Sequence, residues 1–350
     1  MPQQLDHLTA QLDRLASFDA GPFPVISLYL NLQADDRGRD RFDAFLRKEL
    51  PERTRGYGAD GPERKSLDHD AEKIAAYLAS LPGSLNGLAL FACSGADLFE
   101  AIPMAAPVEA HELIVSDQPH LYPLVRVLDQ FPPHVVVLAD THRARIVVFA
   151  LNDVQQTDQV EGVKTRRHKM GGWSQARYQR HIENFHVQHA KEVADHLARI
   201  VRNERIDRIV LSADEAILPL LREQLPKDVL DRVIDVVHLD VNAPNRTILE
   251  TSIAALREND AQTDREHVDA LVAGYRSRGL GCVGVDAVRK AFELGQVDEL
   301  LITSNEAALG DAAEELVAQA RNTSAKVRFI EEASLLAPFG GVGAILRFRL

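Results

Sequence analysis

The sequence contains few of the features that stabilise secreted or membrane-embedded proteins. Its 350 residues include two cysteines, Cys93 and Cys282, which stand far apart and without CxxC spacing, so neither a disulfide framework nor a cysteine metal site is expected. No run approaches the ~18 consecutive apolar residues of a membrane-spanning helix, and the N-terminus has no apolar signal core. We therefore expect a cytoplasmic protein without a membrane partner.

Length and composition describe a globular protein with more than one domain. The chain is 45% hydrophobic and 26% charged, which is typical of proteins with buried cores. Forty basic residues against 52 acidic residues give a net charge of −12. As an average, this charge argues against a nucleic-acid partner or an anionic membrane surface.

Apolar patterns divide the chain into three α/β domains, at residues 1–131, 132–242 and 243–350. In the first, the run VISLYLNL that follows Pro24 predicts a buried strand. In the second, the runs HVVVLAD and RARIVVFA predict a hairpin, and a polar stretch then leads to a long helix from Gln175 to about Asn203. The third domain opens with two predicted helices, at about 248–256 and 268–275, and continues as alternating short strands and helices.

The most informative segment spans residues 164–180, KTRRHKMGGWSQARYQR. It carries six positive charges and no acid, so the rest of the chain sums to −18. Two adjacent glycines allow the backbone to approach another surface closely, and the helix that follows presents N–H groups to anions. Arginines at such a helix start oppose the helix dipole unless a partner supplies negative charge.

Read as a unit, GGWSQARYQR before a long helix resembles the GGQ loop of archaeal and eukaryotic class-one peptide release factors. GLGCVGVDAVRKAFELGQVDELLIT and FGGVGAILRFRL resemble the third domain of these factors, and VISLYLNL and LNGLALFACS match their first domain more loosely. The resemblance therefore covers essentially the whole chain and identifies a member of the release factor and Pelota superfamily, in its bacterial branch, which includes the Balon-type ribosome hibernation factors. It implies a three-domain architecture with an RNase H-like central domain and an L7Ae/L30e-like α/β/α C-terminal domain.

The sequence departs from this family at the residues that perform hydrolysis and decoding. Trp173 stands where the family has glutamine, and its indole has one donor and no acceptor, so it cannot order a hydrolytic water as glutamine does. It can instead stack on a nucleobase. Neither an NIKS motif nor a YxCxxxF pattern is present, so we do not expect stop-codon decoding.

The resemblance implies a factor that enters the ribosomal A site and inserts the Gly171–Gly172 loop towards the peptidyl-transferase centre. Its role would be ribosome hibernation, protection or recognition of stalled ribosomes. Partners would be rRNA, P-site tRNA and a translational GTPase such as elongation factor Tu, which the C-terminal domain would dock. No cofactor and no metal are expected. The residues predicted at the RNA interface are Arg166, Arg167, Lys169, Gly171, Gly172, Trp173, Ser174, Gln175, Arg177 and Arg180.

Two enzymatic alternatives remain open. The first is a ribosome-rescue enzyme that hydrolyses or cleaves peptidyl-tRNA, with Gln175 in place of the missing glutamine. The second is a nucleotide-dependent α/β enzyme, based on the GxGxxG pattern of Gly279–Gly284, although a dinucleotide fingerprint needs a preceding strand and a helix is predicted there. A metal site formed by histidines 181, 186, 189 and 196 is not favoured, because HExxH is absent and most of these side chains should face solvent or rRNA.

Overall fold

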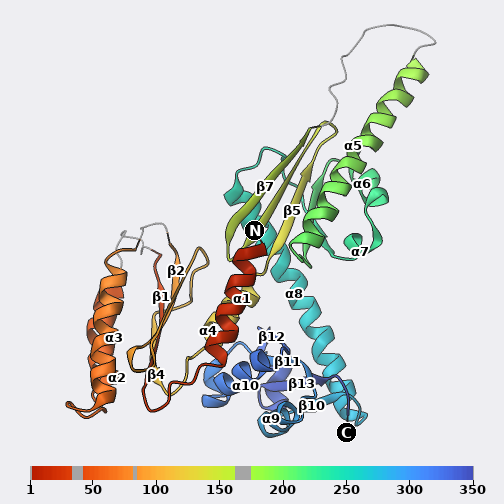
Figure 1. The fold of residues 1–350 in the computed structure, drawn as a ribbon. Helices are drawn as coiled ribbons and strands as arrows, with labels where there is room; N and C mark the ends of the chain where they lie inside the picture. The colour runs from red at the N-terminus through yellow and green to blue at the C-terminus, as the bar shows by residue number, and fades with distance from the viewer. Residues whose placement is uncertain (1, 34–41, 82–84, 162–174, 350) are drawn as a thin grey trace. The chain divides into compact units, whose positions relative to one another are not determined.

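Three β-sheets organise the chain in this computed structural model, which describes residues 2–33, 42–81, 85–161 and 175–349 (Figure 1). They belong to two compact units. One unit joins Leu5–Gln130 to Thr263–Leu350, and the other joins Met1–Gln4 to Phe131–Gln262. The mixed α/β class is confirmed, and the three sheets follow one another along the chain in the order of the three predicted domains. The exact domain bounds stay a prediction.

The first sheet is antiparallel throughout, with the strand order β3-β2-β1-β4. Its central strand β1 is buried over almost its whole length, as the apolar run VISLYLNL predicts. Leu67 and Ile74 of α3 pack on one face of the sheet against Ile26 and Leu28. The elements are α1 (Pro2–Ala16), β1 (Val25–Asn31), α2 (Phe42–Thr54), α3 (Pro62–Leu78), β2 (Gly87–Cys93), η1 (Ser94–Ala96), β3 (Leu98–Met104), β4 (Glu112–Ser116) and α4 (Tyr122–Gln130).

The second sheet has the order β7-β6-β5-β8-β9. The first three strands are antiparallel, whereas β8 and β9 run parallel to β5. This is the strand arrangement of an RNase H-like domain. Helices α5, α6 and α7 cover one face, and the first part of α8 covers the other. The elements are β5 (His134–Ala139), β6 (Arg143–Ala150), β7 (Asp153–Glu161), α5 (Gln175–Asn203), β8 (Ile209–Ala213), α6 (Leu218–Gln224), α7 (Lys227–Leu230) and β9 (Val233–Val236).

The third sheet has the order β10-β13-β11-β12, with β11 and β12 parallel and the other pairs antiparallel. The last part of α8 packs on this sheet through Val268 and Leu271, beside Leu301 and Ile330. The elements are α8 (Asn245–Arg276), β10 (Gly281–Val283), α9 (Val285–Glu293), β11 (Val297–Thr303), η2 (Glu306–Ala308), α10 (Asp311–Asn322), β12 (Lys326–Ile330), α11 (Ala333–Leu336), η3 (Ala337–Phe339) and β13 (Val342–Leu346).

One expectation about the C-terminal third is wrong. The two helices predicted at about 248–256 and 268–275 are a single helix, α8. The polar residues between them interrupt the apolar pattern, but they include neither proline nor glycine, so nothing breaks the backbone hydrogen bonds of the helix. Its first part buries Ile248 in the core of the second sheet.

Several further elements were not anticipated, and two of them are longer than one or two turns or carry buried residues that matter for the fold. The polar stretch before α5 contains the edge strand β7, whose residues alternate between exposed and half-buried positions. The short helix α4 buries Tyr122, Leu124, Val125 and Val127. Among the described residues, no helix combines the length and the apolar character needed to cross a bilayer.

Candidate functional site

The predicted RNA-binding residues lie between β7 and α5 and in the first turns of α5. Seven of them fall within residues 162–174, outside the described part of the chain: Arg166, Arg167, Lys169, Gly171, Gly172, Trp173 and Ser174. Gln175, Arg177 and Arg180 belong to the first turns of α5, where only the helical backbone is described. The predicted start of the long helix at Gln175 and its end at Asn203 are both confirmed.

The described elements on either side of this segment show how the chain positions it. In the register of the second sheet, Arg143 at the start of β6 pairs with Glu161 at the end of β7. The turn between β5 and β6 therefore lies at the same end of the sheet as the connection from β7 to α5. His142 in this turn and Arg143 of β6 add polar groups near the end of β7. Sequence reasoning did not place them there, because the intervening strand β7 was not predicted.

Helix α5 is anchored to the sheet through its C-terminal half. Val193, Leu197 and Val201 are fully buried against residues such as Val137 and Ile146 of the sheet. Burial of each such side chain stabilises the fold by roughly 1.5–3 kcal/mol. The small residues Ala190, Ala194 and Ala198 recur every four positions on the same helix, so the backbone of α5 can approach the strands closely.

A hydrogen-bonded chain adds a polar contact between α5 and β7. The Nε2 atom of His196 donates to Oδ2 of Asp158 on β7 at 3.1 Å, and Nη2 of Arg199 donates to Nδ1 of the same ring at 2.7 Å. These partners assign the ring its tautomer. Gln156 Nε2 also donates to Asp158 Oδ2, at 2.9 Å. These hydrogen bonds connect β7, the strand before the predicted loop, to α5, the helix after it.

The N-terminal part of α5 is less buried than its C-terminal half where its side chains are described. No residue from 183 to 188 is buried, and Val187 is 38% exposed. In Figure 1 this end of the helix extends past the strands of the second sheet. At 1.5 Å per residue, the part of α5 before His189 measures about 20 Å. Among the described side chains of α5, burial against the sheet therefore begins at His189.

The histidines of α5 were expected mostly to face solvent or RNA, and the side chain of His181 lies outside the described part of the chain. The other three are less exposed than expected. His189 is 3% exposed, and neither ring nitrogen has a hydrogen-bond partner among the described residues. His186 is half-buried, and its pKa is lowered by burial and then by the nearby His142 and His189. His196 is hydrogen-bonded at both nitrogens. The helical spacing alone could not reveal that the face carrying His189 packs against the sheet.

A second buried histidine links the second sheet to α8. His134, at the start of β5, is 1% exposed and stacks on Phe149 at a ring-centroid distance of 5.2 Å. Its ring nitrogens lie 2.9 Å from the carbonyl oxygen of Pro132 and 2.9 Å from Oγ of Ser252 on α8. Burial lowers the pKa of His134 to about 4, although the Pro132 carbonyl acts in the opposite direction. The ring is therefore neutral at physiological pH and serves packing.

Two motifs that resemble chemical sites have structural explanations. Asp140 accepts hydrogen bonds from the backbone N–H groups of His142 and Arg143, both at 2.7 Å, which is the ordinary role of aspartate in a turn. The GxGxxG pattern follows helix α8, as expected, and not a strand. A Cβ atom at Gly281 would lie 2.5 Å from the carbonyl oxygen of Leu271, so this glycine permits β10 to pack on α8.

Residues able to hold a metal ion are found elsewhere. Among the residues that the structure describes, one group of His, Cys, Asp and Glu side chains has ligand atoms close enough together: Glu112, His120 and Glu306. It lies in the unit that contains the first and third sheets. The sequence alone does not reveal this group, because its members are distant along the chain and form no motif.

Two family models match most of the chain between them. Residues 119–257 match Bacterial archaeo-eukaryotic release factor family 10, and residues 262–350 match eRF1 domain 3. A peptide chain release factor subunit 1 from Aeropyrum pernix is 26% identical over 242 residues, which cover 61% of this chain and 61% of the relative. Its counterpart from Methanosphaera stadtmanae is 22% identical over 221 residues, covering 57% and 50%. The chain thus spans between half and two thirds of the length of these curated relatives.

Similar solved structures come from the same group of proteins. The archaeal translation termination factor aRF1 covers 99% of this chain and 98% of its own, at 18% identity and a TM-score of 0.28. Archaeoglobus fulgidus Pelota covers 75% and 80%, at 17% identity and a TM-score of 0.35. Dom34 from S. cerevisiae covers 73% and 75%, at 13% identity and a TM-score of 0.44. These scores are low, and the family models carry the assignment.

Proposed function

Because the chain belongs to the release factor and Pelota superfamily, in its bacterial branch, we propose that it is a translation factor that binds the ribosomal A site without decoding a stop codon. The observation that carries this proposal is the position of the basic segment 164–180. It follows the edge strand β7 and continues into the first turns of α5, within the part of the chain that matches the release factor family. Helix α5 packs on the sheet through its C-terminal half, so its N-terminal end is suited to present this segment to a partner.

The division of charge supports RNA as the partner. Six positive charges in residues 164–180 are set against a net charge of −18 over the rest of the chain. The acidic body repels RNA in general, whereas the basic segment binds phosphates where a matching surface admits it. In this proposal Arg166, Arg167, Lys169, Arg177 and Arg180 contact phosphates of rRNA or tRNA, and Trp173 stacks on a base.

Ribosome co-sedimentation over a salt series tests this role. Reversal of charge in the variant Arg166→Glu/Arg167→Glu should weaken binding and should flatten the slope of log K against log salt by about 0.7–0.9 for each phosphate that is no longer neutralised. The control Arg55→Glu/Lys65→Glu makes the same change in net charge at exposed positions of the first domain and should bind as the natural chain does. Equal binding by all three proteins at every salt concentration would refute the role of the segment.

Hibernation or protection of the ribosome is the function that we favour, because Trp173 replaces the glutamine that would order a hydrolytic water. The alternative is peptidyl-tRNA hydrolysis with Gln175, the first residue of α5. A peptide-release assay on stalled ribosome–nascent-chain complexes separates the two. Release by the natural chain that disappears in Gln175→Ala would establish the enzyme, whereas we expect no release.

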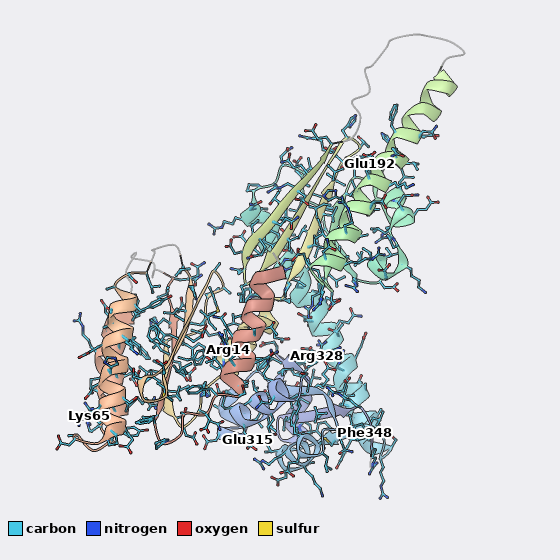
Figure 2. The ribbon with its side chains drawn as sticks, in the orientation of Figure 1. Arg14, Lys65, Glu192, Glu315, Arg328 and Phe348 are labelled. Carbon is cyan, nitrogen blue, oxygen red and sulfur yellow. The ribbon has the colours of Figure 1, made fainter. Side chains whose placement is uncertain are left out.

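For the C-terminal part we propose docking of a translational GTPase, with elongation factor Tu as the candidate. Residues 262–350 match eRF1 domain 3, and several large apolar side chains in this part are exposed. The backbone N–H of Leu346 donates to the carbonyl of Leu280, and Nε2 of Gln296 donates to the carbonyl of Phe348, so these segments lie together. Phe348 is labelled in Figure 2. The exposed side chains are Tyr275 (47%), Leu280 (47%), Leu294 (45%) and Phe348 (44%).

A pull-down with purified elongation factor Tu tests this surface. The variant Leu280→Asp/Phe348→Asp should lose binding, because a carboxylate would be buried against an apolar partner. Val187→Asp, which changes an exposed apolar residue on α5, is the matched control and should bind normally. Equal binding by both variants would show that elongation factor Tu does not dock on this surface.

A further inference from the structure

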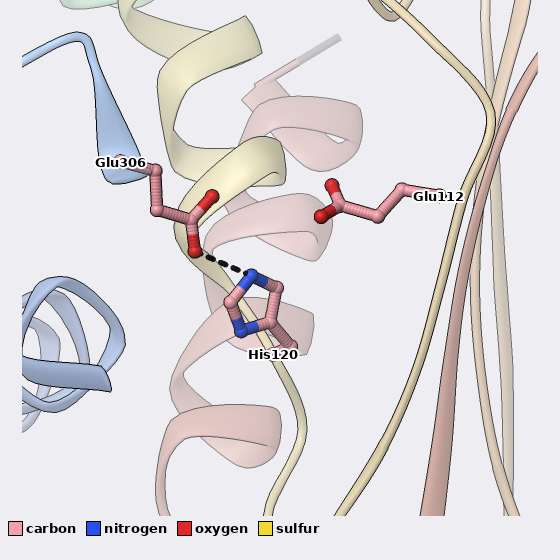
Figure 3. Close-up of side chains that lie close together, drawn as sticks. All are labelled: Glu112, His120 and Glu306. Carbon is pink, nitrogen blue, oxygen red and sulfur yellow. Dashed lines mark ion pairs between the residues drawn. The ribbon is translucent and has the colours of Figure 1, made fainter. Parts of the chain in front are cut away.

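A cavity of about 1300 Å³ lies within the unit formed by the first and third sheets. Its walls come from β4, the connection from β4 to α4, η2 and α10. Among the charged side chains of the lining, the acidic ones outnumber the basic ones. Three of them surround His120: Glu112 from β4 and Glu306 from η2, which Figure 3 draws, and Glu314 from α10. The cavity therefore gathers negative charge around one imidazole.

The geometry of this group is suited to a cation. His120 Nε2 lies 2.9 Å from Oε1 of Glu306, and the dashed line in Figure 3 marks this ion pair. One ligand atom each from Glu112, His120 and Glu306 lie within 4.8 Å of one another. The imidazole side chain is 11% exposed, so little water reaches it. Small movements of flexible glutamate side chains would bring these atoms to the distances of about 2.0–2.2 Å found in zinc sites.

Glu314 supplies the outer contact that metal-binding histidines usually have. Its Oε2 atom lies 3.1 Å from Nδ1 of His120 and accepts a hydrogen bond from the backbone N–H of Tyr122 at 2.8 Å. A carboxylate that holds one ring nitrogen in this way fixes the ring and directs the other nitrogen at the metal. The second oxygen of Glu314, Oε1, is buried without a hydrogen-bond partner among the described residues.

Three carboxyl groups, from Glu112, Glu306 and Glu314, face one imidazole in this group. The carboxyl groups thus outnumber the single side chain that could carry a positive charge beside them. A divalent cation bound at Nε2 of His120 would neutralise more of this negative charge, and any proton on that nitrogen would be released to solvent.

We propose that Glu112, His120 and Glu306 bind a divalent cation of the zinc or manganese class, with Glu314 orienting the imidazole. One imidazole nitrogen and two carboxylate groups suit these ions, whereas magnesium and calcium prefer oxygen ligands alone. The ligands come from the first sheet, the connection before α4 and the third sheet. The ion therefore acts as a structural clip between two sheets that are distant along the chain.

Calorimetric titration of the full chain with Zn²⁺ and with Mn²⁺, after removal of metals with EDTA and of EDTA by dialysis, tests the proposal. We expect one equivalent to bind, and excess metal to raise Tm by about 3 °C or more. Glu306→Gln should abolish this binding, and Glu314→Gln should weaken it roughly 10- to 100-fold. Circular dichroism and melting in EDTA should show both variants folded.

Matched variants distinguish this site from chance binding by other histidines. His186→Ala, on α5, and His69→Ala, exposed on α3, should bind the metal as the natural chain does. Three results would overturn the proposal: absence of binding by the natural chain, binding unchanged in Glu306→Gln, or binding abolished in His186→Ala. Binding of Mg²⁺ in preference to Zn²⁺ and Mn²⁺ would also contradict it. None of these results bears on ribosome binding, which is tested separately.

Discussion

The buried histidine of the second sheet should make the stability of that unit depend on pH. His134 has a pKa of about 4 in the folded chain against 6.5 for an ordinary histidine, chiefly because of burial. Between these values the unfolded chain binds a proton that the folded chain does not, so stability contributed at neutral pH is lost as the pH falls. At 1.36 kcal/mol for each pKa unit, the two values give a loss of about 2 kcal/mol between pH 7.5 and pH 5.

Urea unfolding followed by hydrogen exchange in peptides from β5 and β6 measures this loss. The natural chain should lose about 2 kcal/mol more than His134→Gln over the same pH change, because the variant cannot titrate at this position. His69→Gln removes an exposed histidine with a side chain 58% accessible to solvent, and it should follow the natural chain. If His134→Gln and the natural chain showed the same pH dependence to within about 0.5 kcal/mol, the reasoning from burial would be refuted.

Two substitutions test the packing of the C-terminal part and of α5. Gly281→Ala should lower the free energy of unfolding by at least about 2 kcal/mol, because its Cβ would lie 2.5 Å from the carbonyl oxygen of Leu271. The control Gly56→Ala places its Cβ within 4 Å of no atom and should be nearly neutral, so equal Tm values for the two variants in thermal unfolding would contradict this reasoning. Leu197→Ala, in the buried half of α5, should cost about 2–5 kcal/mol, against less than about 0.5 kcal/mol for the exposed Val187→Ala, measured by urea unfolding.

Elements with a strong local signal could be predicted from the sequence. The apolar run of β1, the two runs of the β5–β6 hairpin and the helical spacing of α5 each identify an element that the structure contains. The strand β7 was not predicted, because an edge strand with one exposed face is mostly polar and its apolar residues alternate only weakly. The continuity of α8 was not predicted either. Its first and last parts pack on different sheets, and the polar residues between them resemble a break in the helix.

The candidate functional residues also fall into two groups, those that form a local motif and those that only the fold brings together. The basic segment and its glycines form a contiguous motif, so the sequence alone identifies them, although their contacts stay a prediction. The group around His120 depends on Glu112 and Glu306, which only the packing of the first and third sheets brings together. No local sequence pattern predicts that these side chains lie close together. The burial of His189 likewise depends on which face of α5 meets the sheet.

A cryo-EM map of the full chain with vacant ribosomes tests the central claim most directly. We predict density for the chain in the A site, with α5 directed inward and the Gly171–Gly172 loop and Trp173 at the peptidyl-transferase centre. Density at another ribosomal site, or in the A site with α5 directed away from that centre, would contradict the account.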